Sequence, residues 1–200
     1  MEWPGSRVVC ASLADQSGSS LAIALGANLP SPAGDPLATL LAVRPQLERR
    51  VQDLGGPGHW SPLFRTAPLG GPAGQPDYLN AVLLLRPARP AGHEAARDLL
   101  KRLQHLEQAF ARQRHERWGP RSLDLDLLWW GDLVCDGAVL QLPHPCWQQR
   151  SFVVAPLAAI AADFRPPGAA VTTIELLNQL LAGASEPPPE RLPGRPGWPE

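Results

Sequence analysis

The segment that most constrains the fold of this chain is the alternating run Leu123-Asp124-Leu125-Asp126-Leu127. Side chains alternate between the two faces of a β-strand, so the run predicts a strand that buries its leucines and presents both aspartates on the opposite face. Strand rise would place the two aspartate Cα atoms about 6–7 Å apart. Carboxylates this close repel each other unless a cation lies between them, and Mg²⁺ prefers such oxygen ligands. The strand is therefore predicted to carry a metal site.

Arginines are concentrated immediately before this strand, at Arg112, Arg114, Arg117 and Arg121. The planar guanidinium group matches the oxygens of a phosphate, and carboxylates beside guanidiniums are typical of phosphoryl transfer. Taken singly, each pattern is also typical of a solvated edge strand or a solvated loop. Their adjacency favours the functional interpretation.

The remaining periodicities predict alternating strands and helices. The expected elements are a strand at 21–25 stopped by Gly26, a helix opened by Pro36 and broken or kinked at Pro45, strands at 60–65 and 78–86, a helix at 92–111, a strand at 123–130, a short hairpin within 133–142, and helices at 151–160 and 173–181, with Ser151 and Thr172 or Thr173 as caps. This β-α-β-β-α-β order, followed by two helices, predicts a single α+β domain with helices packed on a mainly antiparallel sheet.

The two ends of the chain are expected to lie outside this domain, which would span residues 21–183. Residues 1–20 end in a Gly/Ser-rich run that is typical of a flexible extension. Residues 184–200 are rich in proline and hold only Leu192 and Trp198 as large apolar groups. Such a tail can bury little surface, so we expect it to be disordered.

Composition excludes several classes of protein. A 44% apolar content and a net charge of −1 fit a soluble globular domain and disfavour a nucleic-acid-coating protein. No apolar run approaches the roughly 20 residues that cross a bilayer, and the first twenty residues make a poor signal peptide. The 3 cysteines have no paired or metal-binding spacing, which is typical of free thiols in a reducing cytoplasm.

The common nucleotide-binding loops are absent from the sequence. Lys101 is the only lysine and does not follow glycine, so no P-loop exists, and there is no Gly-x-Gly-x-x-Gly motif. A nucleotide would have to be bound by other means, which agrees with the arginine-rich segment.

Several motifs in order resemble those of the 6-hydroxymethyl-7,8-dihydropterin pyrophosphokinases. These folate-pathway enzymes move a pyrophosphoryl group from ATP to a pterin alcohol. The motifs are ALGANL (24–29), FRTAPLG (64–70), QPDYLNA (75–81), Glu107 with Arg112 and Arg114, RWGPRSLDLD (117–126), and PHP (143–145) through RSF (150–152). The resemblance extends from about residue 21 to residue 181. It implies a ferredoxin-like sandwich with mobile loops over the active site.

The resemblance also implies a role for each matching residue. Asp124 and Asp126 would hold two Mg²⁺ ions and, with Arg112 and Arg121, would be the catalytic residues. The residues matched to the ATP site are Glu107, Arg112, Arg114, Arg121, His144 and Arg150. The residues matched to the pterin pocket are Thr66, Leu69, Tyr78, Asn80, Trp118 and Phe152.

The types of these residues suit the ligands, although other interpretations exist. A flat ring favours the aromatic faces of Trp118 and Phe152, and its edge favours an amide that donates and accepts, such as Asn80. Tyr78 and Phe152 are also typical core residues, a lone histidine is often merely solvated, and Glu107 could be a solvated helix residue. The sequence departs from the family at Ala67, where proline is frequent, and at Ala111, where glycine is usual. We expect Ala111 to extend the preceding helix by part of a turn.

On this interpretation the pterin hydroxymethyl oxygen attacks the β-phosphorus of MgATP and AMP leaves. Two alternatives remain open. A nucleotidyltransferase also uses paired aspartates and magnesium but would release pyrophosphate. A ferredoxin-like binding module would perform no chemistry. We expect ATP and the reduced pterin alcohol as partners of a cytoplasmic monomer, with no nucleic acid or membrane partner.

Overall fold

The structure is a computed structural model that describes residues 20–112, 118–184 and 187–199. The predicted flexible extension at residues 1–20 lies outside this range except for Ser20, and so does Arg114. The elements in order are β1 (Leu21–Ala27), α1 (Pro36–Val51), η2 (Gln52–Leu54), β2 (Gly58–Trp60), β3 (Phe64–Thr66), β4 (Tyr78–Leu85), α2 (His93–Ala109), β5 (Asp124–Trp130), β6 (Cys135–Asp136), β7 (Gln141–Leu142), η3 (Trp147–Gln149), α3 (Ser151–Ile160), α4 (Thr173–Ala182) and β8 (Glu190–Arg191).

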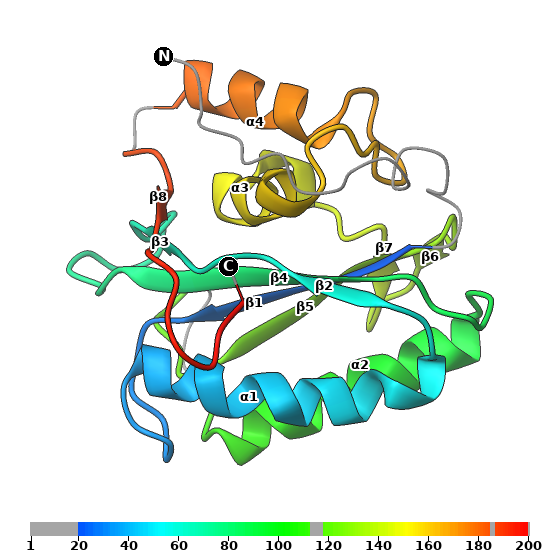
Figure 1. Ribbon diagram of the computed structural model, residues 1–200, viewed down its shortest axis with the longest axis horizontal. Helices are drawn as coiled ribbons and strands as arrows, with labels where there is room; N and C mark the ends of the chain where they lie inside the picture. The colour runs from blue at the N-terminus through cyan, green and yellow to red at the C-terminus, as the bar shows by residue number, and fades with distance from the viewer. Residues whose placement is uncertain (1–19, 113–117, 185–186, 200) are drawn as a thin grey trace.

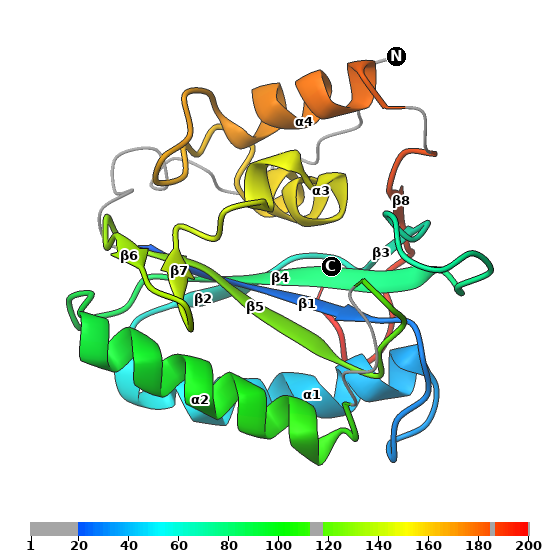
Figure 2. The same ribbon diagram turned by 180° about the vertical axis from the view of Figure 1, so that it is seen from behind.

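A six-stranded antiparallel sheet forms the middle layer, in the order β5-β1-β4-β3-β8, with β2 also paired to β4. Helices α1 and α2 cover one face, α3 covers the other, and α4 packs outside α3 (Figures 1 and 2). The predicted α+β class, the β-α-β-β-α-β order and the β6–β7 hairpin are confirmed. Helices cover both faces of the sheet, because its strands are apolar on both sides.

Strand β1 shows how the two faces divide. Leu21, Ile23 and Leu25 enter the core beneath α1 and α2, whereas Ala22 and Ala24 enter the second core beneath α3. All seven residues of β1 are buried. A central strand that is covered on both faces has apolar residues at every position instead of an alternating pattern. The sequence of β1 has this continuous apolar character. The small alanines leave space on the α3 side.

Strand β5 carries the aspartates to that α3 side. It pairs with β1 so that Asp126 lies opposite Ala24 and Asp124 opposite Gly26. Leu125 and Leu127 enter the opposite core, beneath α1 and α2. The predicted alternation of buried leucines with aspartates on the other face is therefore confirmed.

Five local predictions are wrong. Ala111 does not extend α2, which ends at Ala109. Gly26 does not stop β1, which continues to Ala27. Pro45 does not break α1, because buried Leu40, Val43 and Leu47 hold the helix on the sheet and tertiary packing outweighs propensity. The expected strand at 60–65 is split into β2 and β3. Between them, the Ser61 hydroxyl takes the place of a backbone carbonyl and accepts a hydrogen bond from Val82 N at 2.9 Å. Ser151 is not a cap, because Arg150 occupies that position, whereas Thr172 forms the expected cap of α4.

The predicted disorder of residues 184–200 is also wrong for the part of the tail that the structure describes, residues 187–199. Strand β8 joins the edge of the sheet beside β3, and Leu192 and Trp198 are buried in the core. Trp198 keeps only 5% of its surface exposed, and its indole N–H donates to Ser61 O at 2.8 Å. One large aromatic side chain with a satisfied polar atom thus anchors a segment whose composition alone predicts disorder.

Among the residues with described positions, no helix is long and apolar enough to cross a membrane. Cys135 and Cys146 are free thiols.

Candidate active site

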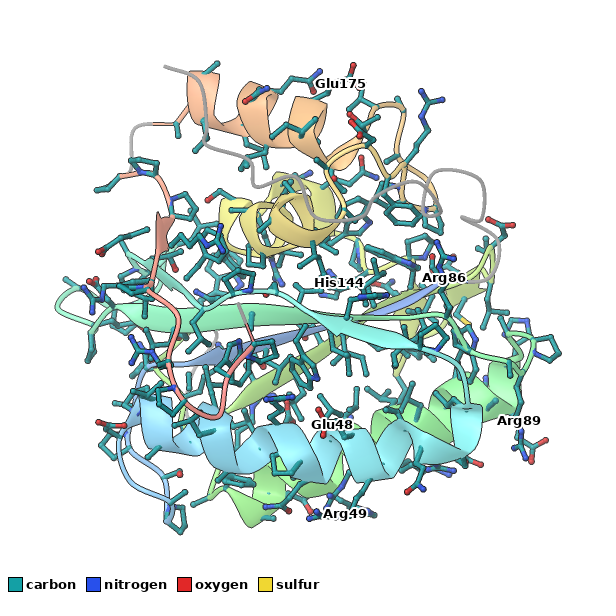
Figure 3. The ribbon with its side chains drawn as sticks, in the orientation of Figure 1. Glu48, Arg49, Arg86, Arg89, His144 and Glu175 are labelled. Atoms are coloured by element: carbon teal, nitrogen blue, oxygen red, sulfur yellow. The ribbon has the colours of Figure 1, made fainter. Side chains whose placement is uncertain are left out.

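A cavity of about 470 Å³ opens on the α3 side of the sheet, beside the carboxyl end of β1. Its walls come from β1, the end of β3 with the loop that follows, the starts of β4 and β5, and residues 144–152. The predicted site residues that line it are Thr66, Leu69, Tyr78, Asn80, Trp118, Arg121, Asp124, Asp126, His144, Arg150 and Phe152. Figure 3 shows His144 on this side of the sheet, whereas Glu48 lies on the α1 side.

The floor at one end of the cavity is a buried amide. Asn80, which is 4% exposed, donates from Nδ2 to Thr66 Oγ1 at 2.8 Å. Gly26 lies beside it in the paired strand, and a Cβ atom there would lie 3.0 Å from Asn80 Oδ1. Glycine at this position therefore keeps the space in front of the amide open. The sequence predicted Asn80 and Thr66 as site residues, whereas the role of Gly26 was not predicted.

Aromatic and apolar side chains surround this amide. Tyr78 is half-buried, its hydroxyl donates to Gly119 O at 3.1 Å, and burial raises its pKa. Trp118 and Leu69 are 54% and 47% exposed at the mouth, which is unusual for large apolar groups. Trp118 also adopts a left-handed φ of 59°, a strained backbone that is frequent at ligand sites. The Arg150 guanidinium lies 5.6 Å from the centre of the Phe152 ring.

The loop between β3 and β4 is fastened to the segment that carries Trp118. A Cβ atom on Gly71 would lie 2.2 Å from Trp118 O, so the two backbones approach closely only because residue 71 is glycine. Gln75 Nε2 donates to Trp118 O at 3.2 Å. Buried Asn28 donates to Pro76 O at 3.0 Å and accepts from Arg121 N at 2.8 Å. Asn28 thus joins the loop to the arginine segment, a role that its place after a buried strand could have suggested.

The other half of the cavity is a cluster of carboxylates and guanidiniums. Arg121 Nη1 donates to Asp124 Oδ2 at 2.8 Å, and Arg112 Nη2 lies 2.7 Å from Asp124 Oδ1. Arg112 also pairs with Glu107, which is 3% exposed. Glu107 Oε1 accepts a hydrogen bond from Leu125 N at 2.8 Å. Glu107 is therefore a buried link between α2, β5 and Arg112. The alternative of a solvated helix residue is wrong.

Asp126 occupies a different environment from Asp124. Arg150 Nη1 donates to its Oδ2 at 3.1 Å, and His144 Nε2 lies 3.9 Å from the same oxygen. Burial, followed by the neighbouring charge of Asp124, raises the pKa of Asp126. Burial also lowers the pKa of His144, so its neutral form is favoured. The site therefore favours an additional cation beside Asp126.

The donor set fits Mg²⁺ bound together with a phosphate ligand. The described part of the chain contains no group of three or more metal-binding side chains. However, Asp124 Oδ1 is buried and faces the Arg112 guanidinium, a cation partner that a metal ion could replace, and Asp126 lies on the same face of the strand. Mg²⁺ is usually held by one or two carboxylates, with waters and substrate phosphates as its remaining ligands. Two aspartates in a cavity that is also lined by the guanidiniums of Arg121 and Arg150 meet that requirement.

A second cavity of about 350 Å³ adjoins the first, and both are lined by Asp126 and His144. Glu107 and Arg112 line this second cavity instead of the first. Its apolar walls include Leu100 of α2 and Leu140, and Gln104 supplies an amide. These residues were not predicted from the sequence, because leucines at helical spacing are indistinguishable from core positions.

Comparison with known proteins identifies the family. The fold and the site first define the class, an α+β enzyme with the side chains of phosphoryl transfer gathered on one face of its sheet. A sequence profile of the family 7,8-dihydro-6-hydroxymethylpterin-pyrophosphokinase (HPPK) matches residues 22–162. The chain belongs to this family.

Proteins named 2-amino-4-hydroxy-6-hydroxymethyldihydropteridine pyrophosphokinase are similar to the chain over most of its length. The protein of Pseudomonas aeruginosa is 40% identical over 172 residues, 86% of this chain and 96% of the relative. That of Haemophilus influenzae is 36% identical over 157 residues, 78% and 90% of the two chains. That of Synechocystis is 42% identical over 120 residues, 60% of this chain and 58% of the relative.

Solved structures show the same fold within larger chains. A crystal structure of HPPK-DHPS in complex with substrates has a TM-score of 0.57 at 10% identity, covering 82% of this chain and 43% of that one. Wild-type HPPK-DHPS from Plasmodium falciparum has a TM-score of 0.55 at 10% identity, covering 82% and 45%. The chain thus spans less than half of these solved chains. The predicted family is confirmed, and the predicted activity is the one that the family's description names.

Proposed function

We propose that this chain transfers the pyrophosphoryl group of ATP to 6-hydroxymethyl-7,8-dihydropterin and releases AMP. The observation that carries the proposal is the cavity itself, which has an amide and aromatic half and a carboxylate and guanidinium half on one face of the sheet. The hydroxymethyl oxygen forms a bond to the β-phosphorus, while the bond from that phosphorus to the α,β-bridging oxygen breaks. The hydroxyl proton passes to water, and AMP leaves with the bridging oxygen.

The pterin occupies the half of the cavity around Asn80. The Asn80 amide, held by Thr66, meets the hydrogen-bonding edge of the ring, and Gly26 leaves the space for it. Trp118 and Phe152 contact the two faces of the ring, while Tyr78 and Leu69 close its sides. This placement points the substituent of the ring at the aspartates.

The phosphates of ATP occupy the charged half. In the free protein, Arg112 and Arg121 pair with Asp124, and Arg150 pairs with Asp126. We propose that these guanidiniums exchange their aspartate partners for phosphate oxygens when ATP binds, which is favourable because their geometry suits both. His144 donates a hydrogen bond to the same phosphates, and Arg114, outside the described residues, adds a further charge.

Asp124 and Asp126 would hold Mg²⁺, and the bound ion supplies positive charge to the phosphate oxygens. Glu107 keeps Arg112 in place through its bond to the backbone of β5. Rate enhancement then comes from positioning and charge stabilisation, without a protein nucleophile.

The second cavity takes the base of the nucleotide. It adjoins the charged cluster at Asp126 and His144, so a nucleotide whose phosphates lie beside the aspartates has its base within reach of Leu100 and Leu140. The leucines supply apolar faces, and the Gln104 amide can recognise the polar edge of the base.

We further propose that the protein acts as a cytoplasmic monomer.

A turnover assay that identifies the nucleotide product by mass tests the proposal. With MgATP and the reduced pterin alcohol, we expect one AMP for each pterin diphosphate formed. ADP with a monophosphorylated pterin would indicate attack at the γ-phosphorus, and release of pyrophosphate would indicate a nucleotidyltransferase. Binding of the pterin without turnover would indicate a binding module.

A further inference from the structure

Residues 187–199 form a strap along one edge of the sheet, which we call the C-terminal strap. It follows α4 and lies beyond residue 162, where the match to the family ends. In Figure 1 this red segment begins on the α4 side, passes β3 and reaches the α1 side. The strap therefore connects both helical layers across the sheet edge.

The first part of the strap pairs with β3. Glu190 and Arg191 form the antiparallel ladder opposite Arg65 and Phe64. The Arg65 guanidinium lies 3.2 Å from Glu190 Oε2, and Leu192 N donates to Leu63 O at 2.8 Å. Strand β3 contains three residues, so this pairing supports its whole outer side except Thr66.

The second part anchors the strap to the body of the protein. The rings of Trp198 and Trp60 meet edge to face at 5.2 Å, and the Trp198 indole donates to Ser61 O at 2.8 Å. Arg44 of α1 donates to Gly197 O at 2.9 Å. The strap thus holds the backbone on both sides of the break between β2 and β3.

The backbone that the strap holds leads directly to the proposed pterin pocket. Thr66, the last residue of β3, accepts the Asn80 amide, and the glycine-rich loop over the cavity begins at Ala67. On its inner side, β3 is bonded to β4, with Thr66 opposite Tyr78. Without the strap, a three-residue strand next to a loop with left-handed glycines would be paired on one side only. Short edge strands with few bonds open readily.

We infer that the C-terminal strap, anchored by Trp198, is a positioning element for the pterin half of the active site. This inference rests on the proposed function. The strap fixes residues 61–65, and through them it fixes the Thr66 hydroxyl that orients the Asn80 amide. The nucleotide cavity is built from α2, β5 and residues 137–145, which the strap does not hold. The strap should therefore affect recognition of the pterin and leave recognition of ATP unchanged.

The test replaces the anchor in the full chain, as Trp198→Ala, and compares Leu54→Ala as a matched control. Leu54 is equally buried, at 5% exposure. It lies near the end of β4 that is remote from Asn80, where its carbonyl accepts a hydrogen bond from Ala88 N. Steady-state kinetics are measured at a temperature where circular dichroism shows both variants folded. For Trp198→Ala we expect the KM for the pterin to rise about fivefold, the effect of one misplaced hydrogen bond, with the KM for ATP changed less than about twofold. Leu54→Ala should change neither KM.

Equal rises in both KM values, a rise shared by Leu54→Ala, or no rise would overturn the inference and leave a purely stabilising strap. If Trp198→Ala does not fold, Trp198→Phe keeps an aromatic ring and removes the bond to Ser61 O together with one ring of the indole. Its KM for the pterin should still rise by about twofold, and an unchanged value would overturn the inference. An unaltered chain that forms no AMP would instead refute the proposed function.

Discussion

The two faces of the sheet use the same strands for different purposes. On the face covered by α1 and α2, leucines such as Leu83 and Leu125 fill the space against the helices. On the α3 face, apolar side chains such as Phe64, Val82 and Trp129 pack against α3 over only one part, where the rings of Trp129 and Trp147 lie 5.1 Å apart. The rest of that face is the cavity, whose floor contains Gly26, Asn80 and the aspartates.

The difference shows how one alternating sequence can separate stability from chemistry. Because neighbouring residues of a strand point to opposite faces, Leu125 can close the core while Asp124 and Asp126 face the cavity. The polar groups of the cavity are held mainly by one another, as Arg121 and Asp124 are. Substitutions on the closed face should therefore change the free energy of unfolding, and those on the cavity face should change catalysis.

The largest effect is expected for Asp126→Asn, which should lower the turnover rate by about a hundredfold or more. The variant keeps the shape of the side chain and removes the charge that would bind Mg²⁺. AMP release at saturating Mg²⁺ measures this effect, and a near-normal rate would disprove the metal assignment.

The stability of Asp126→Asn without metal should hold or rise. The pKa of Asp126 is raised above its ordinary value of 3.8, so the folded state loses stability as the pH rises through the unfolded and then the folded pKa. The amide lacks this titration, so its advantage should appear above about pH 4. Asp124→Asn is the control, because it leaves Arg112 and Arg121 without their carboxylate and should be destabilising.

The opposite face should show the reverse behaviour in Leu83→Ala. Leu83 is 1% exposed in the core beneath α1 and α2, so truncation should lower the free energy of unfolding by about 2–5 kcal/mol. The KM values for both substrates should stay within about twofold of the unaltered chain, because the lost methyl groups face away from the cavity. Chemical denaturation and steady-state kinetics measure the two effects. A large rise in either KM would show that the two faces are coupled.

Local patterns in the sequence predicted the element order, the aspartate pair and most of the cavity residues. The alternation in β5 and the helical spacing of Leu99, Leu103 and Leu106 needed no knowledge of the rest of the chain. The strap could not be predicted, because its stability depends on a bond between Trp198 and Ser61, 137 residues apart. Proline content predicts how the isolated tail behaves, but it does not predict a contact with a distant part of the chain.

The end of α2 was mispredicted for a similar reason. Helix propensity favours alanine at position 111, but the helix ends at Ala109 and Ala111 has a left-handed φ of 58°. There Arg112 N donates to Glu107 O at 3.1 Å, and the Arg112 side chain pairs with the buried Glu107 carboxylate. The helix therefore ends next to the Glu107–Arg112 ion pair, although the helix propensity of alanine would favour its continuation through residue 111.

A smaller effect on the cavity face is expected for Gly26→Ala. The new methyl group would lie 3.0 Å from Asn80 Oδ1, so the amide must shift. We expect the KM for the pterin to rise about tenfold, because small displacements of a positioning group weaken recognition strongly. The KM for ATP should change little. Pterin titration followed by ligand fluorescence measures the affinity directly, and an unchanged affinity would place the pterin elsewhere.

Backbone strain at the edge of the site can be relieved by Ala111→Gly. A left-handed alanine costs about 1–2 kcal/mol relative to glycine, and the greater freedom of glycine in the unfolded chain offsets about 0.4–1 kcal/mol of that. The net result should be a free energy of unfolding higher by about 0–1.6 kcal/mol. Denaturant unfolding measures it, with Ala109→Gly inside the helix as a control that should be destabilising. Loss of stability in both variants would contradict the left-handed conformation.

The smallest effect concerns an ion pair beside the closed face, where the pKa shift has the opposite sign to that of Asp126. Arg102 donates to Asp53 at 2.7 Å and lowers the pKa of this carboxyl below 3.8. A lowered folded pKa adds stability that is present above the unfolded pKa and is lost as the pH falls through the folded value. Both side chains are more than 40% exposed, at 41% and 43%, so solvent screening limits the contribution to about 0.2–1 kcal/mol.

Asp53→Asn should therefore be slightly less stable than the unaltered chain at pH 7, and the difference should vanish as the pH falls below about 4. Urea unfolding at a series of pH values measures the difference. Addition of salt should reduce it at pH 7, because exposed charges are screened. Asp126→Asn should differ from the unaltered chain in the opposite direction over the same pH range, because burial raises one carboxyl pKa and an exposed guanidinium lowers the other. If the free energy of unfolding changed with the same sign in both variants, a carboxylate on the cavity face would not differ from the Asp53 carboxylate in its effect on stability.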